Sequence, residues 1–492
     1  MRYPGFLFFL IMLCLGFNAS GQPRVRNLTL EESIEIAKSQ SPDALNAKQT
    51  FKTSYWDWRS FKASNLPALG LTATAPNINQ SISSQSIDGV QSYAAYKVIS
   101  ANANLGLTQK IGITGGTLSL NSTLSGVHNA NSPNPLPYVS VPINVELNQP
   151  LFTYNQFRWD RKIMPLKYIQ AKRKYIEDIE QVSITASTYF FSLLQAQVEE
   201  KIAMINLSNY DTLYHIAKGR YQLGKIAENE LLTLELSYLK AQAAVENADL
   251  DLDNAQFRFK SYLRLQDSSR VLLLPPGNIN FFKIDPVKAV DLARENSSNS
   301  LDFKKRLLDA ASAVNYAKLN GRFDANVRAV VGLTQQGSSV RDAYYNPADQ
   351  RQFSLGVSIP IVDWGVAHGK IKMAQSQEDI VKTSVEQDAI DFERNVYLKV
   401  VQFNMQQNQL KIAAKSDTVA RKSYEVTKGR YLIGKINDIT NLNLSQIDQD
   451  NAQKNYYYAL QTFWTNYYEI RKLTHYDFRK NEALQFDMQV MK

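Results

Sequence analysis

The sequence predicts an α+β membrane protein in which β-strands lead into very long helices. Two observations predict it: a phrase that occurs twice, and strand patterns that precede two uninterrupted helical stretches. The phrase reads KGRYQLGKI at residues 218–226 and KGRYLIGKI at residues 428–436, an offset of 210 residues. The same offset aligns Pro150 with Pro360. Because self-similarity at a fixed offset identifies a repeated unit, the chain is predicted to be a duplication.

The duplication sets the predicted domain organisation. The sequence divides into a leader at residues 1–21, a first repeat at 22–275, a second repeat at 276–474 and a tail at 475–492 that fits no element. Each repeat opens on a short predicted helix, at residues 29–45 and 285–301, and these two helices align at an offset of 256 rather than 210. The first repeat therefore carries 46 extra residues, which we place near 77–138.

The leader has the pattern of a secretory signal peptide. Arg2 supplies the positive start, an apolar run follows, and small residues at Ala19 to Gly21 form a cleavage site. The only cysteine, Cys14, lies in this leader, so the mature chain is predicted to have no disulfide. An apolar run of about 13 residues is too short to span a bilayer as a helix. A membrane-embedded form would therefore be a β-barrel.

Composition argues against several classes of function. The net charge of +9 over 492 residues is small and spread along the chain, whereas nucleic-acid-binding proteins show a basic stripe. Four scattered histidines form no metal-ligand pattern. The sequence has no glycine-rich phosphate loop, no HExxH and no CxxC motif. We therefore expect no enzyme activity, no cofactor, no metal site and no nucleic-acid partner.

Six segments show the alternation of apolar and polar residues that marks a strand. It is cleanest near residues 139–148 and 352–362, and less regular near 69–75, 101–107, 118–124 and 325–334. Alternation over about ten residues is typical of a transmembrane β-strand. A half-buried strand of a soluble sandwich has the same period, so alternation alone does not separate the two.

The helical stretches favour the membrane protein. Residues 155–222 and 365–432 contain few helix breakers and span roughly 68 residues each, which corresponds to about 100 Å of helix. A soluble sandwich has no use for two such helices. Apolar residues recur every seven positions in both stretches, as in coiled coils: Ile179, Ala186 and Leu193, then Ala389, Val396, Phe403 and Leu410. Helices are predicted to return to about Leu265 and about Leu473, so each repeat contains an antiparallel helical hairpin.

Aromatic residues gather where strands and helices join. Six of them form the predicted set: Trp56, Trp58, Phe152, Tyr154, Trp159 and Trp364. Aromatic rings with a polar edge favour the membrane–water interface, whereas core packing at a helix–strand joint would select the same residue types. We favour the interface, because three separate stretches converge on one level.

The repeated turn is the candidate functional site. Glycine suits the left-handed conformation that ends a helix, because it has no Cβ to clash. The residues that we single out are Arg220, Tyr221, Gly224 and Lys225 in the first repeat, and Arg430, Tyr431, Gly434 and Lys435 in the second. A plain helix stop with favourable helix-end cations would explain part of this motif. Because the side chains around the glycine repeat as well, we interpret the turns as docking surfaces for another helical hairpin.

The leader, the duplicated strand–helix unit, the heptad helices and the twice-used GRYxxGKI turn together resemble the TolC family of outer-membrane efflux proteins, over about residues 28–474. The resemblance implies a homotrimer in which a shared β-barrel continues into an α-helical coiled-coil tunnel across the periplasm. It implies an outer-membrane channel of a Gram-negative bacterium, surrounded by outer-membrane lipid. Small molecules or proteins would leave passively, in a tripartite efflux or type I secretion system. A periplasmic adaptor would join the turns to an inner-membrane pump of RND or ABC type.

The chain departs from the family at two places. Some members carry acidic residues six and nine positions after the second turn glycine, where this chain has Thr440 and Asn443, with Asp438 nearby. Since carboxylates attract cations, we expect weaker block by divalent cations at this tunnel constriction. Within the 46 extra residues we expect a short turn at Ile111–Gly116 and long loops at 77–99 and 127–138, as in barrels with short periplasmic turns and long outward loops. This order permits six strands per chain, or an outward hairpin that caps a barrel of the family's four strands per chain. We favour four.

A second class of function stays open. A secreted coiled-coil scaffold that tethers envelope layers without a pore would share the heptads and the turns. It would not need amphipathic strands or aromatic junctions, which is why we favour the channel.

Overall fold

The computed structural model describes residues 25–87, 90–129, 137–266, 269–277, 279–435 and 439–486. The leader predicted at residues 1–21 therefore lies outside the described residues. The chain forms two compact units. The first contains residues 1–49, 174–297 and 393–492, and the second contains residues 50–173 and 298–392. Each unit thus combines segments of both sequence repeats, and each is described by itself below.

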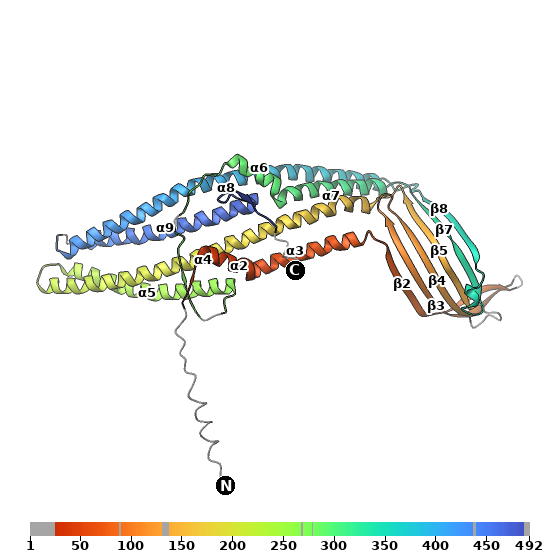
Figure 1. Cartoon of the computed structure of the whole chain (residues 1–492), viewed down its shortest axis with the longest axis horizontal. Coiled ribbons are helices and arrows are strands. Elements are labelled where there is room, and N and C mark those ends of the chain that lie inside the picture. The colour runs from red at the N-terminus through yellow and green to blue at the C-terminus, as the bar shows by residue number, and fades with distance from the viewer. Residues whose placement is uncertain are drawn as a thin grey trace, which may run out of the picture. The chain divides into compact units, whose positions relative to one another are not determined.

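The second unit is built on a sheet of six antiparallel strands (Figure 1). The strands are β2 (Ala68–Ile87), β3 (Val90–Ile111), β4 (Gly116–Asn129), β5 (Tyr138–Leu151), β7 (Asp324–Gly337) and β8 (Ala348–Ser358), and they lie side by side in that order. Five of the six predicted strand segments fall within them, and the sixth, 352–362, overlaps β8 but continues four residues beyond its end. The expectation of four strands is wrong, because β3 and β4 pair along their length within the same sheet.

Two sequence expectations about the extra residues need correction. Residues 77–99 were expected to form a long loop, but they continue β2 and β3, which pair as far as Ile87 and Val90. The turn between Ile111 and Gly116 is short, as expected. Most of the loop expected at 127–138 lies outside the described residues.

Four helices adjoin the strands of this unit. Helix α3 (Pro42–Ala63) precedes β2, α4 (Gln156–Gln222) follows β5, α7 (Ser298–Asn320) precedes β7, and α8 (Val366–Leu432) follows β8. Polar side chains start the two long helices. Asn155 accepts a hydrogen bond from the backbone N–H of Arg158, and the Asp363 carboxylate accepts from those of Gly365 and Ala367. Such caps satisfy N–H groups that have no partner within the helix.

The first unit contains the remaining elements. They are β1 (Val25–Leu28), α2 (Leu30–Gln40), α5 (Glu228–Leu263), β6 (Arg270–Leu273), α6 (Pro286–Asn296), α9 (Ile439–Thr474), β9 (Tyr476–Asp477) and β10 (Glu482–Ala483). β1 and β6 pair in parallel. Thr29 and Glu32 form a capping box at the start of α2, and Asp285 caps α6. The long helices α4 and α8 have the predicted bounds to within one residue.

The heptad positions pack as expected. Ala186 and Leu193 of α4 and Val396, Phe403 and Leu410 of α8 are buried, whereas Ile179 and Ala389 are half-buried. The ring of Phe403 stacks on that of Phe463 in α9, with ring centroids 5.2 Å apart. Within the described ranges, no helix combines the length and the apolar character that a bilayer crossing requires.

The expectation that residues 475–492 fit no element is wrong for the first part of this tail. β9 and β10 pair as a small antiparallel ladder. The carboxylate of buried Asp477 accepts hydrogen bonds from the Tyr467 hydroxyl at 2.5 Å and from Arg471 at 3.1 Å. Arg471 also pairs with buried Glu180 of α4 at 3.0 Å. A charge that is buried in this way requires partners, and the tail supplies one of them.

Candidate functional site

The two repeated turns have the same backbone hydrogen bonds. The N–H of Lys225 donates to the carbonyl of Arg220 at 2.8 Å, and the N–H of Lys435 donates to that of Arg430 at 3.0 Å. Gly224 and Gly434 have φ angles of 66° and 72°. This pattern is the Schellman motif, in which a left-handed residue lets the chain turn back and bond the last helical carbonyls. The sequence KGRYxxGK thus fixes how both long helices end.

The neighbours of the two turns differ. Tyr431 is 1% exposed, whereas Tyr221 at the same position of the first repeat is 40% exposed. Burial raises the pKa of the Tyr431 hydroxyl above its usual range. The two tyrosines therefore have different environments despite their identical sequence context.

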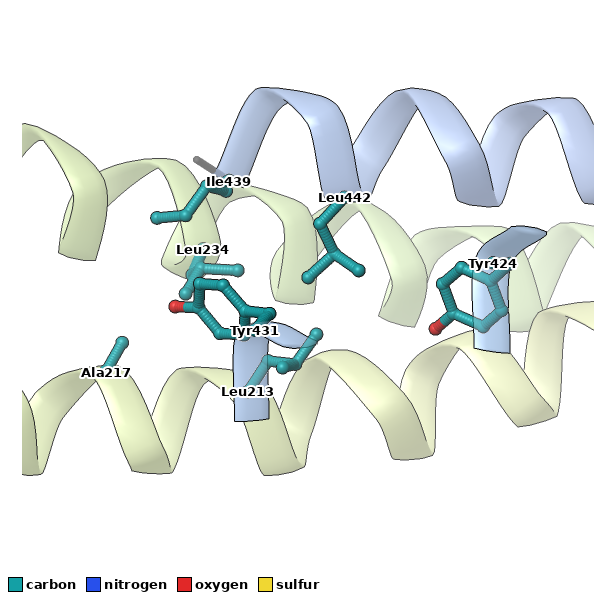
Figure 2. Packing of buried hydrophobic residues seen from close by; sticks show 7 residues of the cluster. All are labelled: Leu213, Ala217, Leu234, Tyr424, Tyr431, Ile439 and Leu442. Carbon is teal, nitrogen blue, oxygen red and sulfur yellow. The ribbon is translucent and has the colours of Figure 1, made fainter. Parts of the chain in front are cut away.

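Tyr431 belongs to a hydrophobic cluster that joins all four helices near the turns. Figure 2 shows the tyrosine ring among leucines from the neighbouring helices. The members are Leu213 and Ala217 of α4, Leu234 of α5, Tyr424 and Tyr431 of α8, and Ile439 and Leu442 of α9. Ile226, which follows the first turn, packs against it. The cluster thus holds the helical hairpin of each repeat against the other.

Arg220 binds the end of the other long helix. Its guanidinium donates to the backbone carbonyl of Tyr431 at 3.3 Å and to that of Leu432 at 3.1 Å. It also lies over the Tyr431 ring, 5.3 Å from the centroid. A helix C-terminus has carbonyls without intrahelical partners and a partial negative charge, so a cation is favourable there. Arg220 therefore stabilises the end of α8 at the second turn.

The other predicted docking residues face solvent. Lys225, Arg430 and Lys435 are exposed. Two apolar side chains lie beside them: Leu223 is 75% exposed and Ile433 is 67% exposed. Sequence reasoning missed Leu223 and Ile433, because positions 222 and 223 differ from 432 and 433 between the repeats. The sequence did contain a signal for them, since a large apolar residue directly precedes the turn glycine in both repeats.

The predicted constriction residues lie at the start of α9, except Asp438, which is outside the described residues. Thr440 is exposed. Asn443 is half-buried and accepts a hydrogen bond from the Tyr210 hydroxyl of α4 at 3.2 Å. Burial raises the pKa of Tyr210, and the Asp450 carboxylate raises it further. The Thr440 side chain therefore faces solvent, whereas the Asn443 side-chain oxygen already accepts a hydrogen bond from Tyr210.

Two turns further along α9, Asp450 accepts a hydrogen bond from Asn206 of α4 at 2.7 Å. Asn206 in turn accepts from Gln446. Burial raises the pKa of the Asp450 carboxyl. These residues form a polar layer that follows the hydrophobic cluster along α4 and α9.

The predicted interface aromatics fall into two groups. Trp58 stacks on Tyr168 with ring centroids 5.6 Å apart, the Tyr154 hydroxyl lies 2.6 Å from that of Ser312, and Trp159 donates to Asn315 at 3.4 Å. These three pack against neighbouring helices. Trp56, Phe152 and Trp364 are exposed, and Trp364 reaches 95%. Packing between helices thus accounts for Trp58, Tyr154 and Trp159, and the membrane-interface role stays a prediction for the three exposed residues.

The described part of the chain holds no group of three or more metal-ligating side chains. It has a shallow cavity of about 510 Å³ between α7 and α8, lined by Tyr316, Pro360 and Met373 among others. Its lining is mostly apolar and also includes Asp363 and Lys370.

Comparison with known proteins agrees with this geometry. A family model described as outer membrane efflux protein matches residues 92–263 and 325–474, which together are more than half of the chain. A comparison with curated proteins found no matching sequence.

Several solved structures share the fold. The CmeC outer membrane channel of Campylobacter jejuni has a TM-score of 0.64 and 14% identity, over 94% of this chain and 87% of that one. The outer-membrane channel OprN has a TM-score of 0.63 and 16% identity, over 90% and 89%. VceC of Vibrio cholerae has a TM-score of 0.62 and 11% identity, over 93% and 97%.

CmeC and OprN are described as outer-membrane channels and VceC as an outer membrane protein, and this chain shares their fold. The strands of the second unit correspond to the membrane part, and the long helices correspond to a periplasmic extension. From the family match, the protein is an efflux channel of the outer membrane. The chain belongs to the outer membrane efflux protein family.

Proposed function

We propose that three copies of this chain form the exit channel of a tripartite efflux or type I secretion system. Small molecules or proteins leave through it passively, and an inner-membrane transporter of RND or ABC type supplies the energy. A periplasmic adaptor connects that transporter to the two repeated turns. The observation that carries this proposal is the pair of identical turns, each of which ends a helix of 67 residues and presents apolar and cationic side chains to solvent.

The chemistry of the turns defines the adaptor surface. Leu223 and Ile433 are exposed large apolar residues, and Lys225 and Lys435 follow one residue after each turn glycine. Exposed apolar residues that are ringed by charge are typical of protein–protein contacts. The expected partner surface is a helical hairpin with a small apolar patch and carboxylates around it. Tyr431 and Arg220 contribute indirectly, because they hold the second turn in place.

The docking surface can be tested with exposed residues alone. A photo-cross-linking residue at Leu223 or Ile433 is expected to capture the adaptor in cells, and Lys225→Glu with Lys435→Glu is expected to abolish both capture and export. Lys201→Glu is the matched control, because Lys201 is an exposed lysine on α4 outside the repeated phrase. Export that survives the double charge reversal, with the trimer intact, would mean that the turns only terminate helices.

The constriction is proposed at the start of α9, with Thr440 and Asn443 lining it and Asp438 close by in sequence. The support is the exposed side chain of Thr440 and its position six residues after Gly434. A constriction without carboxylates at 440 and 443 attracts cations weakly, because there is little charge to concentrate them.

Single-channel conductance of the purified protein in a planar bilayer tests the channel itself, with subunit number measured on the same sample. Discrete, stable currents from a trimer support the proposal. A trimer that conducts no current, either as the wild type or in variants that remove the contact of Arg220 with the end of α8, would contradict the proposed channel. A protein that stays in solution without detergent would contradict it as well.

A further inference from the structure

The two strands β3 and β4, which we expected to form a hairpin outside the sheet, lie within it. β3 pairs with β2 on one side and with β4 on the other, and β4 continues to β5. The ladder between β3 and β4 runs from Val98↔Asn129 to Ile111↔Gly116. A hairpin that capped the sheet from outside would leave β2 beside β5. Instead β2 and β5 are separated by two full strands, as Figure 1 shows.

The turn between β3 and β4 is fixed to the helical side of this unit. The Gln109 side chain donates to the carbonyl of Asn65, just after α3, at 2.9 Å. The Asn155 side chain, which caps α4, donates to the carbonyl of Ile113 at 3.1 Å. Gly115 has a φ of 84° and lies against Asn155, so the turn closes on that side chain. The extra hairpin is therefore anchored between the same two helices as β2 and β5.

One face of the sheet carries an apolar row that crosses the extra strands. Paired residues in an antiparallel ladder lie on the same face. From β2 to β7 the row contains Leu69, Leu107, Leu120, Val145 and Val331, each paired with the next and each exposed in the single chain. On the edge strand β8 it ends at Arg351, which pairs with Asp349 at 3.2 Å. β3 and β4 thus present the same surface as their neighbours.

The opposite face is polar over the same strands. The adjacent row contains Gly70, Gly106, Asn121, Asn144, Gly332 and Gln350. The Asn121 side chain donates to that of Asn144 at 3.2 Å, and Thr123 donates to Asn104 at 2.8 Å. In a transmembrane barrel, apolar residues face lipid and polar residues face the interior. Both faces of β3 and β4 meet that requirement.

The sheet has two edges that its own strands leave unpaired, β2 and β8. Because six is an even number, β2 and β8 run in opposite directions. An identical copy that places β2 beside β8 therefore continues the antiparallel pattern without interruption. We propose that three copies close in this way into a barrel of eighteen strands, in which β3 and β4 form one third of the wall. This inference rests on the homotrimer of the proposed function.

Eighteen strands have a consequence for the pore. Barrel diameter grows about linearly with strand number, and barrels of about 16 to 18 strands leave an aqueous channel. The barrel is then about half again as wide as one of twelve strands. Uncharged amides and hydroxyls from the extra hairpin line it, including Asn104, Asn121 and Thr123. The cargo class that this exit suits is bulky, hydrated solute, since the extra strands offer amides and hydroxyls, and Glu146 and Arg328 on the same face of the sheet form an ion pair at 2.7 Å.

Cysteine labelling tests the wall directly, because Cys14 is the only cysteine in the chain. In a Cys14→Ser background, the matched pair Asn121→Cys and Leu120→Cys probes the two faces of β4. The control pair Asn144→Cys and Val145→Cys probes β5, which lies in the wall under either arrangement. The protein is reconstituted as the full-length trimer. Each position is scored for conductance block by a charged methanethiosulfonate, and for spin-label relaxation by a lipid-soluble or a water-soluble agent.

We expect the β4 pair to behave like the β5 pair. Asn121→Cys should block the current on modification, and the label at Leu120→Cys should respond to the lipid-soluble agent only. Water access to both β4 positions, with normal alternation on β5, would overturn the inference and leave the proposed channel standing. Absence of both trimer and current would refute the proposed function as well. Strand counting by electron microscopy of the same trimer gives an independent answer, eighteen or twelve.

Discussion

The two repeated turns share seven of nine residues and the same backbone hydrogen bonds, but they have different roles. In the second repeat, Tyr431 is buried in the cluster and Arg430 is exposed; in the first, Tyr221 is exposed and Arg220 binds the end of α8. The buried tyrosine and the bound arginine thus come from opposite repeats and meet each other. Local sequence determines how each helix ends, and packing between the hairpins decides which side chains remain available to a partner.

The largest expected difference is between the tyrosines. Tyr431→Ala removes a buried ring, which costs on the order of 3 kcal/mol or more, whereas Tyr221→Ala should cost little. The loss should appear as local opening near the turns, because such termini open before the whole protein unfolds. Hydrogen exchange at the amides of Leu213 and Ala217 measures it. Equal effects of the two substitutions would contradict the difference between the turns.

The second-largest expected difference is between Arg220 and Arg430. Here the first repeat, rather than the second, should show the larger loss of stability. Arg220→Ala removes charged hydrogen bonds to two helix-end carbonyls and should cost roughly 1 to 2 kcal/mol, since Arg220 is only half-buried. Arg430→Ala should leave the exchange rates of the turn unchanged. The measurement is again hydrogen exchange, at the last amides of α8. Arg220→Lys is a useful control, because it keeps the charge but loses the forked geometry.

The glycines should show no difference between repeats. A Cβ at Gly224 meets nothing within 4 Å, and one at Gly434 meets only the end of the Arg220 side chain at 3.8 Å. Alanine at either position therefore adds only the cost of a left-handed backbone, about 1 kcal/mol. Thermal unfolding in detergent should give matched shifts for Gly224→Ala and Gly434→Ala. Unequal shifts would mean that the backbones differ in solution.

A smaller, pH-dependent effect is expected at Asp450, whose counterpart in the first repeat is the exposed Lys240. Because the pKa of Asp450 is raised in the fold, its ionisation opposes folding. Stability should therefore fall as pH rises from the ordinary value of 3.8 through the raised pKa. Asp450→Asn should remove that part of the pH dependence. Melting temperatures from pH 4 to 8 in both proteins check it; parallel curves would argue against a buried carboxyl.

The smallest effect concerns ions. Thr440 corresponds to Glu230 in the first repeat, so Thr440→Glu gives the second repeat the acidic residue of the first. With three copies around one axis, three carboxylates would raise the local concentration of cations. We expect stronger block of the current by divalent cations, while the wild type is blocked weakly. Thr440→Gln is the uncharged control, and a wild-type channel that divalent cations already block strongly would move the constriction elsewhere.

Sequence alone predicted the local features well. The ends of α4 and α8 followed from the turn glycines, and the strands near 139–148 and 352–362 followed from alternation. The full lengths of β2 and β3 did not, because residues 77–82 are rich in Asn, Gln and Ser, which are not strong strand formers. Which tyrosine is buried was equally unpredictable, since it depends on contacts between residues about 210 positions apart.

The C-terminal tail has a consequence for how the chain is made. Asp477 follows α9 and accepts hydrogen bonds from Tyr467 and Arg471 inside the first unit. The first unit cannot complete this network until residue 477 has been synthesised. A chain that stops at Thr474 leaves Arg471 with one buried acidic partner fewer and Tyr467 without its acceptor. Premature termination there, or a fusion that replaces these residues, should yield a protein that the cell's quality control removes.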